Sequence, residues 1–106
     1  MAANALIELC GVEELSPGAM RRVELPGREA LAVFNVEGTF YVTSDACTHG
    51  EASLASDGAL QGCIVECGWH YGAFDVRSGE PTASPCEVPL RTYPVTLRDG
   101  KVCIAA

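Results

Sequence analysis

The chain is poor in basic residues. It has 7 Lys and Arg against 14 Asp and Glu, which gives a formal net charge of −7. A nucleic-acid surface needs clustered Lys and Arg to neutralise phosphates, so this balance excludes nucleic acid as the partner. The charge by itself indicates solubility, and it would also steer the protein toward a positively charged partner.

Long hydrophobic runs are also missing. No apolar stretch approaches the roughly 18 residues of a membrane span, and the first eight residues lack both parts of a secretory signal. With 48% hydrophobic and 20% charged residues, the 106-residue chain is expected to fold rather than remain disordered. The sequence therefore predicts one domain over residues 1–106, cytoplasmic, without a membrane segment, and monomeric or weakly oligomeric.

Histidine is scarce as well, and its 2 occurrences define the most informative stretch of the chain. Cys47 and His49 form a Cys-x-His pair, and after seventeen intervening residues Cys67 and His70 form a Cys-x-x-His pair. Two thiolates and two imidazoles make a complete four-ligand set for a metal site. The spacing leaves two chemistries open, a structural zinc ion or a Rieske [2Fe–2S] cluster, in which imidazoles replace thiolates on one iron.

Glycines and aromatic residues near both pairs favour iron–sulfur over zinc. Glycine lets backbone amides approach closely, and bridging sulfides need such N–H donors more than a closed zinc site does. An apolar screen beside the second pair would also suit a cluster. The glycines are Gly50, Gly62, Gly68 and Gly72, and the aromatic residues are Trp69, Tyr71 and Phe74.

Two segments carry a family resemblance, CTHGEASL at residues 47–54 and IVECGWHYGAFD at residues 64–75. They resemble the Rieske-type ferredoxins of bacterial aromatic-ring-hydroxylating dioxygenase systems, such as those for naphthalene and biphenyl. The likeness covers about residues 6–104. It implies one [2Fe–2S] cluster, with Cys47 and Cys67 on one iron and His49 and His70 on the other. It also implies a third, proline-containing loop over the cluster at residues 82–88.

Four further cysteines remain after this assignment. Because no secretory signal is found, a reducing compartment is expected and disulfides are not. Cys10, Cys63 and Cys103 lie in apolar runs beside predicted strands, where a free cysteine acts as a small buried hydrophobe. Cys86 lies in the predicted covering loop and is expected to pack near the cluster.

Turn residues recur every eight to twelve residues between short β-rich runs, which predicts an all-β sandwich or barrel. Glu37-Gly38 and Asp99-Gly100 are two-residue hairpin turns. No ten-residue stretch has the periodicity of a helix. With the resemblance, this predicts a Rieske-type fold, an antiparallel β base with an inserted cluster-binding subdomain at about residues 45–85. The predicted strands cover residues 6–10, 20–25, 30–36, 39–43, 74–76, 93–98 and 101–104, with a further hairpin at 57–66.

The resemblance also bears on the reduction potential. High-potential Rieske proteins of respiratory complexes share the motif but carry an extra disulfide, and here the matching positions are Ala52 and Trp69. Those proteins donate hydroxyls to cluster sulfurs from positions that are Gly72 and Phe74 in this chain. Fewer donors stabilise the reduced, more negative cluster less. We therefore expect a potential near the low end of the Rieske range of about −150 to +300 mV.

The function that the resemblance implies is electron transfer, not catalysis. A flavin-dependent ferredoxin reductase would be the donor, and the Rieske centre of a terminal oxygenase the acceptor. No histidine is left for a 2-His-1-carboxylate iron site, and 106 residues leave no room for a flavin domain. His49 and His70 would pass the electron, beside a contact formed by Trp69, Tyr71 and Pro85. Packing around the cluster is an equally good role for Trp69 and Tyr71.

Three rival functions stay open at this point. One is a small Rieske-type subunit of a nitrite reductase-like redox enzyme. A second, of another class, is a zinc-stapled interaction module. A redox-active thiol enzyme is a poor third, because residues 67–70 have the length of a Cys-x-x-Cys motif but lack its second thiol and a βαβ context.

Overall fold

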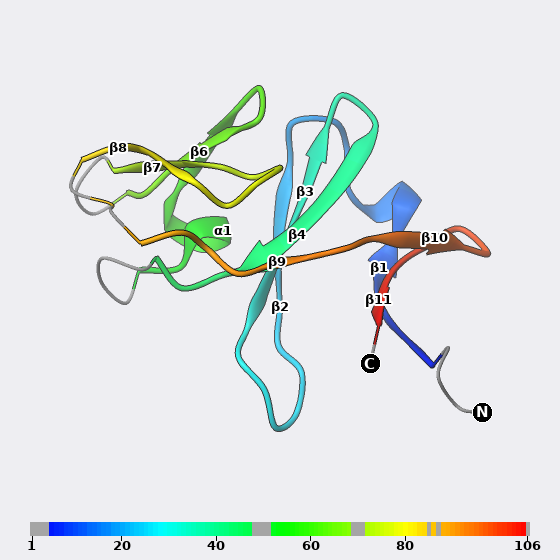
Figure 1. The fold of residues 1–106 in the computed structure, drawn as a ribbon. Helices are drawn as coiled ribbons and strands as arrows, with labels where there is room; N and C mark the ends of the chain where they lie inside the picture. The colour runs from blue at the N-terminus through cyan, green and yellow to red at the C-terminus, as the bar shows by residue number, and fades with distance from the viewer. Residues whose placement is uncertain (1–4, 48–51, 69–71, 85, 87, 106) are drawn as a thin grey trace.

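The computed structural model describes residues 5–47, 52–68, 72–84, 86 and 88–105 (Figure 1). Every strand pair recorded within these residues is antiparallel, so the predicted all-β class is confirmed. In chain order the elements are β1 (Leu6–Gly11), η1 (Val12–Glu14), β2 (Met20–Val23), β3 (Leu31–Val36), β4 (Thr39–Ser44), α1 (Leu54–Asp57), β5 (Ala59–Gln61), β6 (Ile64–Glu66), β7 (Ala73–Asp75), β8 (Pro81–Ala83), β9 (Thr92–Tyr93), β10 (Thr96–Arg98) and β11 (Lys101–Ala105).

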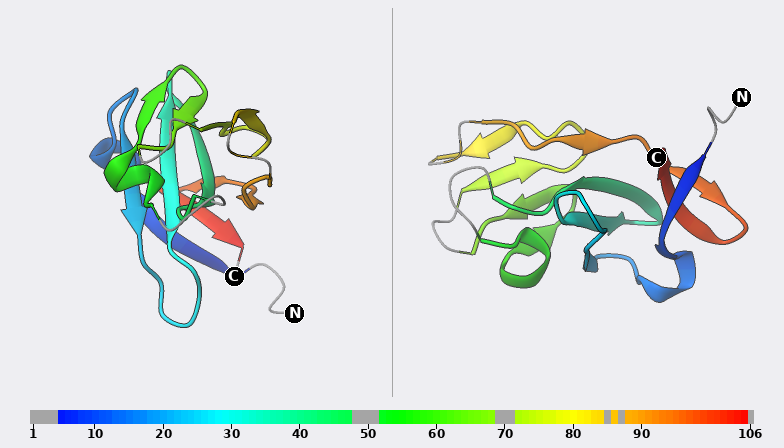
Figure 2. Two further views of the ribbon diagram at one scale, coloured as in Figure 1. Left: turned by 90° about the vertical axis from the view of Figure 1, so that its left-hand side faces the viewer. Right: turned by 90° about the horizontal axis from the view of Figure 1, so that it is seen from below.

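The strands form three small sheets along an elongated molecule of 42 × 27 × 20 Å. Their strand orders are β1-β11-β10, β2-β3-β4-β9 and β5-β6-β7-β8. Figures 1 and 2 show the β5–β8 sheet at one end of the molecule and the β1-β11-β10 sheet at the other. The first two sheets make the base, and the third sheet carries the segment between the two Cys/His pairs.

Strand β3 lies between two hydrophobic cores and is buried on both faces. Leu31 and Val33 belong to the core beneath β1 and β11. Ala32 and Phe34 belong to a second core, shared with the β5–β8 sheet. Because successive side chains of a strand point to opposite faces, one apolar run serves both cores. This strand therefore fixes the β5–β8 end of the molecule to the base.

Two hairpin turns have the conformation that their sequences predict. Glu37 and Gly38, between β3 and β4, have φ angles of 51° and 96°. Asp99 and Gly100, between β10 and β11, have φ angles of 53° and 74°. Positive φ at both central residues is the two-residue turn that matches the twist of antiparallel strands.

The predicted strand over residues 93–98 is divided in two. β9 pairs with β4 in the middle sheet, whereas β10 pairs with β11 in the terminal sheet. Pro94 and Val95 lie between them. Proline has no N–H to donate to a ladder, so the chain leaves one sheet at this point and joins the next.

Two short elements were not predicted. Residues 82 and 83 were predicted to belong to the proline-containing loop at 82–88, but with Pro81 they form edge strand β8 against β7. Pro81 is its first residue, a position where proline is tolerated. Helix α1 has a single turn, too short for helical periodicity, and Ser53 caps it by accepting a hydrogen bond from the N–H of Ser56 at 3.1 Å. Among the described residues, no helix has the length and apolar character needed to cross a membrane.

Candidate metal centre

Cys47 and Cys67 each begin a short loop that is closed in the same way. The N–H of Cys47 donates to the carbonyl of Ala52 at 2.9 Å, and the N–H of Cys67 donates to the carbonyl of Gly72 at 2.6 Å. In both cases the acceptor is five residues further along the chain. Each loop contains one of the two histidines of the sequence. The same backbone hydrogen bond therefore closes both Cys/His segments at their described ends.

Packing of two sheets brings these cysteines together. Cys47 follows β4 of the middle sheet, and Cys67 follows β6 of the β5–β8 sheet. Both side chains are 2% exposed and belong to the same hydrophobic core. Phe74, which we expected to screen the site, is fully buried in that core. The two thiols thus lie in an apolar environment from which water is largely excluded.

Helix α1 connects the two loops. It starts just after the first loop, and the carbonyl of its last residue, Asp57, lies against Gly68 of the second loop. A Cβ atom at Gly68 would lie only 1.9 Å from that carbonyl oxygen. Only glycine allows this contact, so the second loop is held directly against the element that follows the first.

A third thiol lies beside the first cysteine. The Sγ of Cys86 is 3.9 Å from the Sγ of Cys47, and the Cys86 side chain is 6% exposed. Its N–H donates to the carbonyl of Ala83 at 3.2 Å, immediately after β8. Burial, together with the neighbouring Cys47, raises the pKa of Cys86 to about 12. Cys86 therefore packs where the covering loop was expected to place it, as a protonated thiol.

A buried carboxylate holds the start of the first loop. Asp45 is 2% exposed; its Oδ1 accepts from the N–H of Ala55 at 2.9 Å, and its Oδ2 lies 3.1 Å from Nε of Arg22. Its backbone carbonyl accepts from the N–H of Leu54 at 2.8 Å. The sequence predicts no role for Asp45 beyond the start of the cluster-binding subdomain. Its position two residues before Cys47 was the available signal.

The structure tests only part of the predicted site. Residues outside the described ranges are His49, His70, Trp69, Tyr71 and Pro85, so their roles stay predictions. Cys10 and Cys103 are buried, as expected. Cys63 is only half-buried, because it lies with Gly62 in the turn between β5 and β6, and Gly62 provides that turn with a φ of 61°.

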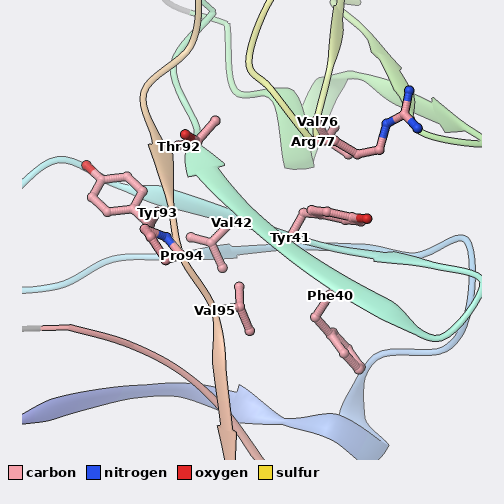
Figure 3. Close-up of a pocket in the computed structure, with 9 residues that line it drawn as sticks. All are labelled: Phe40, Tyr41, Val42, Val76, Arg77, Thr92, Tyr93, Pro94 and Val95. Atoms are coloured by element: carbon pink, nitrogen blue, oxygen red, sulfur yellow. The ribbon is translucent and has the colours of Figure 1, made fainter.

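A pocket of about 350 Å³ lies between β4, β9 and the turn after β7 (Figure 3). Apolar side chains such as Val42 and Val95 line it, and no cysteine does. Figure 3 shows the Arg77 guanidinium directed away from the pocket, and its Nη2 pairs with Asp75 at 2.8 Å. The pocket therefore has no feature that links it to the metal centre.

Comparison with known proteins identifies the family. A model of the Rieske [2Fe-2S] domain matches residues 5–94. The chain belongs to the Rieske domain family. It is 48% identical over 99 residues to the ferredoxin component of the p-cumate 2,3-dioxygenase system of Pseudomonas putida, covering 93% of this chain and 84% of that protein.

Solved Rieske structures agree with the fold. The ferredoxin of Sphingomonas yanoikuyae B1 superposes with a TM-score of 0.93 at 44% identity, covering 96% of this chain and 99% of that one. A chain from the complex of reduced oxygenase and oxidized ferredoxin in carbazole 1,9a-dioxygenase superposes with a TM-score of 0.90 at 44% identity, covering 94% and 92%. The resemblance to Rieske-type ferredoxins of aromatic-ring dioxygenase systems is thereby confirmed.

The Rieske domain carries one [2Fe–2S] cluster, and the described residues fit this cofactor. Two buried thiols on separate, hydrogen-bonded loops provide sulfur donors in an apolar environment. Gly68 and Gly72 let the Asp57 carbonyl and the Cys86 side chain pack directly against the second loop. The zinc-stapled module is therefore the wrong alternative for this site.

Proposed function

We propose that this Rieske domain is a one-electron carrier that links a flavin-dependent reductase to the Rieske centre of a terminal aromatic-ring oxygenase. The observation that carries the proposal is near full-length similarity to proteins named as ferredoxin components of such systems. The structure of a ferredoxin bound to its oxygenase in carbazole 1,9a-dioxygenase supports the acceptor. The reductase is proposed from the same family of systems.

Within this proposal, Cys47 and Cys67 bind one iron, and His49 and His70 bind the other. Support comes from the two loops: each is closed by the same hydrogen bond, each starts with a buried cysteine, and each contains one histidine in sequence. The cluster, when bound, supplies a single one-electron couple in the Rieske potential range.

The described residues restrain the two proposed cysteine ligands and shield them from water. The hydrogen bonds from Cys47 to Ala52 and from Cys67 to Gly72 hold the described ends of both loops, and the apolar core excludes water from the two cysteine side chains. Ligands that do not move between redox states keep the reorganisation of electron transfer small. Ligand orientation by such surrounding contacts is how proteins tune metal centres. In this proposal, the residues around the two cysteines support rapid electron transfer.

The proposed carrier works in the cytoplasm as a monomer that meets its partners briefly. Six free cysteines among the described residues suit a reducing compartment. The net charge of −7 favours fast, weak association with a positively charged partner surface, as in transient electron-transfer complexes. Such association weakens as salt screens the charges.

Reconstitution tests this function. The purified holoprotein is mixed with a flavin-dependent reductase, NADH and the terminal oxygenase of a p-cumate, biphenyl or carbazole system, and aromatic product is measured. We expect product only when all components are present, with the ferredoxin turning over many times. Failure with every oxygenase, together with stable copurification with a large redox enzyme, would favour the nitrite reductase-like subunit instead. A Cys47→Ser variant is the matched negative control.

A further inference from the structure

Among the residues that the structure describes, Cys86 places a buried thiol beside the first cysteine, and the proposed ligand set does not use it. Its sulfur is 3.9 Å from the sulfur of Cys47, within the range of a hydrogen bond that involves sulfur. Cys47 is 2% exposed and Cys86 is 6% exposed, so water does not compete for this contact. The two residues come from separate segments, one after β4 and the other after β8.

The direction of the hydrogen bond follows from the proposed ligand role of Cys47. A cysteine that binds iron is a thiolate and has no proton to donate. Cys86 is not one of the proposed ligands, and an ordinary thiol is protonated at neutral pH, so the proton between the two sulfurs belongs to Cys86. We propose that Cys86 is a tuning residue, whose S–H donates to the Cys47 thiolate and raises the reduction potential of the cluster.

The physical effect is electrostatic. Reduction adds one negative charge to the cluster, and part of that charge falls on its sulfur ligands. A donor aimed at a ligand sulfur therefore stabilises the reduced form more than the oxidised form. An S–H group is a weaker donor than a hydroxyl, so the gain is small and the potential stays low in the Rieske range.

Gly72 explains how the thiol reaches this position. A Cβ atom at Gly72 would lie 2.3 Å from Cys86 Sγ and 3.3 Å from Cys86 Cβ. The space that a side chain at position 72 would use is thus filled by Cys86 from the opposite segment. Position 72 is one of the two at which the resemblance implies a hydroxyl donor in high-potential Rieske proteins, and in this chain the neighbouring space holds a thiol.

Electrochemistry on the purified holoprotein tests the proposal without any partner. We compare wild type with Cys86→Ala, Cys86→Ser and the control Cys103→Ala, which removes a buried cysteine of the base. Cys86→Ala should lower the equilibrium constant for reduction about threefold, which is a fall of about 28 mV at about 59 mV per tenfold. Cys86→Ser keeps a donor, so its reduction potential should equal or exceed that of wild type. Cys103→Ala should leave the reduction potential unchanged.

Equal reduction potentials for wild type and Cys86→Ala would overturn the proposal. An equal fall of the potential in the Ala and Ser variants would also overturn it, because it would indicate a packing effect.

A second measurement uses only the wild-type protein. The infrared difference spectrum of reduced minus oxidised wild type should contain an S–H stretching band, because the acceptor sulfur gains charge. A spectrum without that band overturns the hydrogen bond. Neither readout depends on reductase or oxygenase, so failure of the reconstitution assay leaves this test standing.

Discussion

Arg22 and Asp45 join the base of the protein to the first cysteine loop. The Nε atom of Arg22 in β2 lies 3.1 Å from Oδ2 of Asp45, whose other oxygen accepts from the N–H of Ala55. Arg22 is 44% exposed, whereas Asp45 is 2% exposed, so the carboxylate is the desolvated member of the pair. The loop position therefore depends on a buried charge that two partners satisfy.

Replacing Asp45 tests this dependence. Asp45→Ala leaves the N–H of Ala55 without its acceptor and Arg22 without its buried partner. We expect the free energy of unfolding of the holoprotein to fall by about 2–4 kcal/mol, measured by denaturant titration. Glu24→Gln is the control, because the bond from Arg22 to Glu24 is exposed on both sides and should contribute less than about 1 kcal/mol. Equal losses in the two variants would contradict the role assigned to Asp45.

A second prediction concerns Gly68. Gly68→Ala would place a Cβ atom against the backbone carbonyl of Asp57, so the second loop must move away from α1. We expect the variant to retain little cluster after purification, measured as visible absorbance and iron per chain. Gly11→Ala is a matched control, because the nearest atom to its Cβ is 3.5 Å away and its φ is −79°. Full cluster content in Gly68→Ala would show that the loop tolerates displacement.

The contact between Gly72 and Cys86 yields a third prediction. Gly72→Ser alone forces the new Cβ into the Cys86 sulfur and should reduce cluster content. Cys86→Ala removes that sulfur, and the double variant then has room for a hydroxyl near the first cysteine. Because O–H is a stronger donor than S–H, we expect the double variant to have a higher reduction potential than Cys86→Ala. A double variant at or below the potential of Cys86→Ala would refute this exchange of donors.

The potential of the wild-type protein is a fourth prediction. The sequence has no hydroxyl at positions 72 and 74, and in the structure a weak thiol donor lies beside Gly72. Few and weak donors leave the reduced cluster poorly stabilised. A redox titration should therefore give a value near the low end of the Rieske range, and a value above about +100 mV would be inconsistent with it.

Much of this fold can be predicted from local sequence. The Glu37-Gly38 and Asp99-Gly100 turns were predicted because positive φ angles demand such residues, and both occur. The division of residues 93–98 was missed, since a β-rich run does not reveal that its two halves pair in different sheets. Helix α1 was missed because one turn has no periodicity.

The site shows the same limits. Its four-ligand pattern and its family are visible in sequence, and the family assignment is confirmed, whereas the ligand assignments stay predictions. The contacts of Asp45 with Arg22 and of Cys86 with Cys47 depend on long-range packing. In each pair the two residues lie far apart along the chain, so no local sequence pattern predicts the contact.

The most direct test of the account is the metal and sulfide content of the purified protein, read together with its electron paramagnetic resonance spectrum after reduction. Two cysteines and two histidines that hold a Rieske cluster predict about two irons and about two acid-labile sulfides per chain, with a reduced-state signal. One zinc per chain, no labile sulfide and no signal would contradict it.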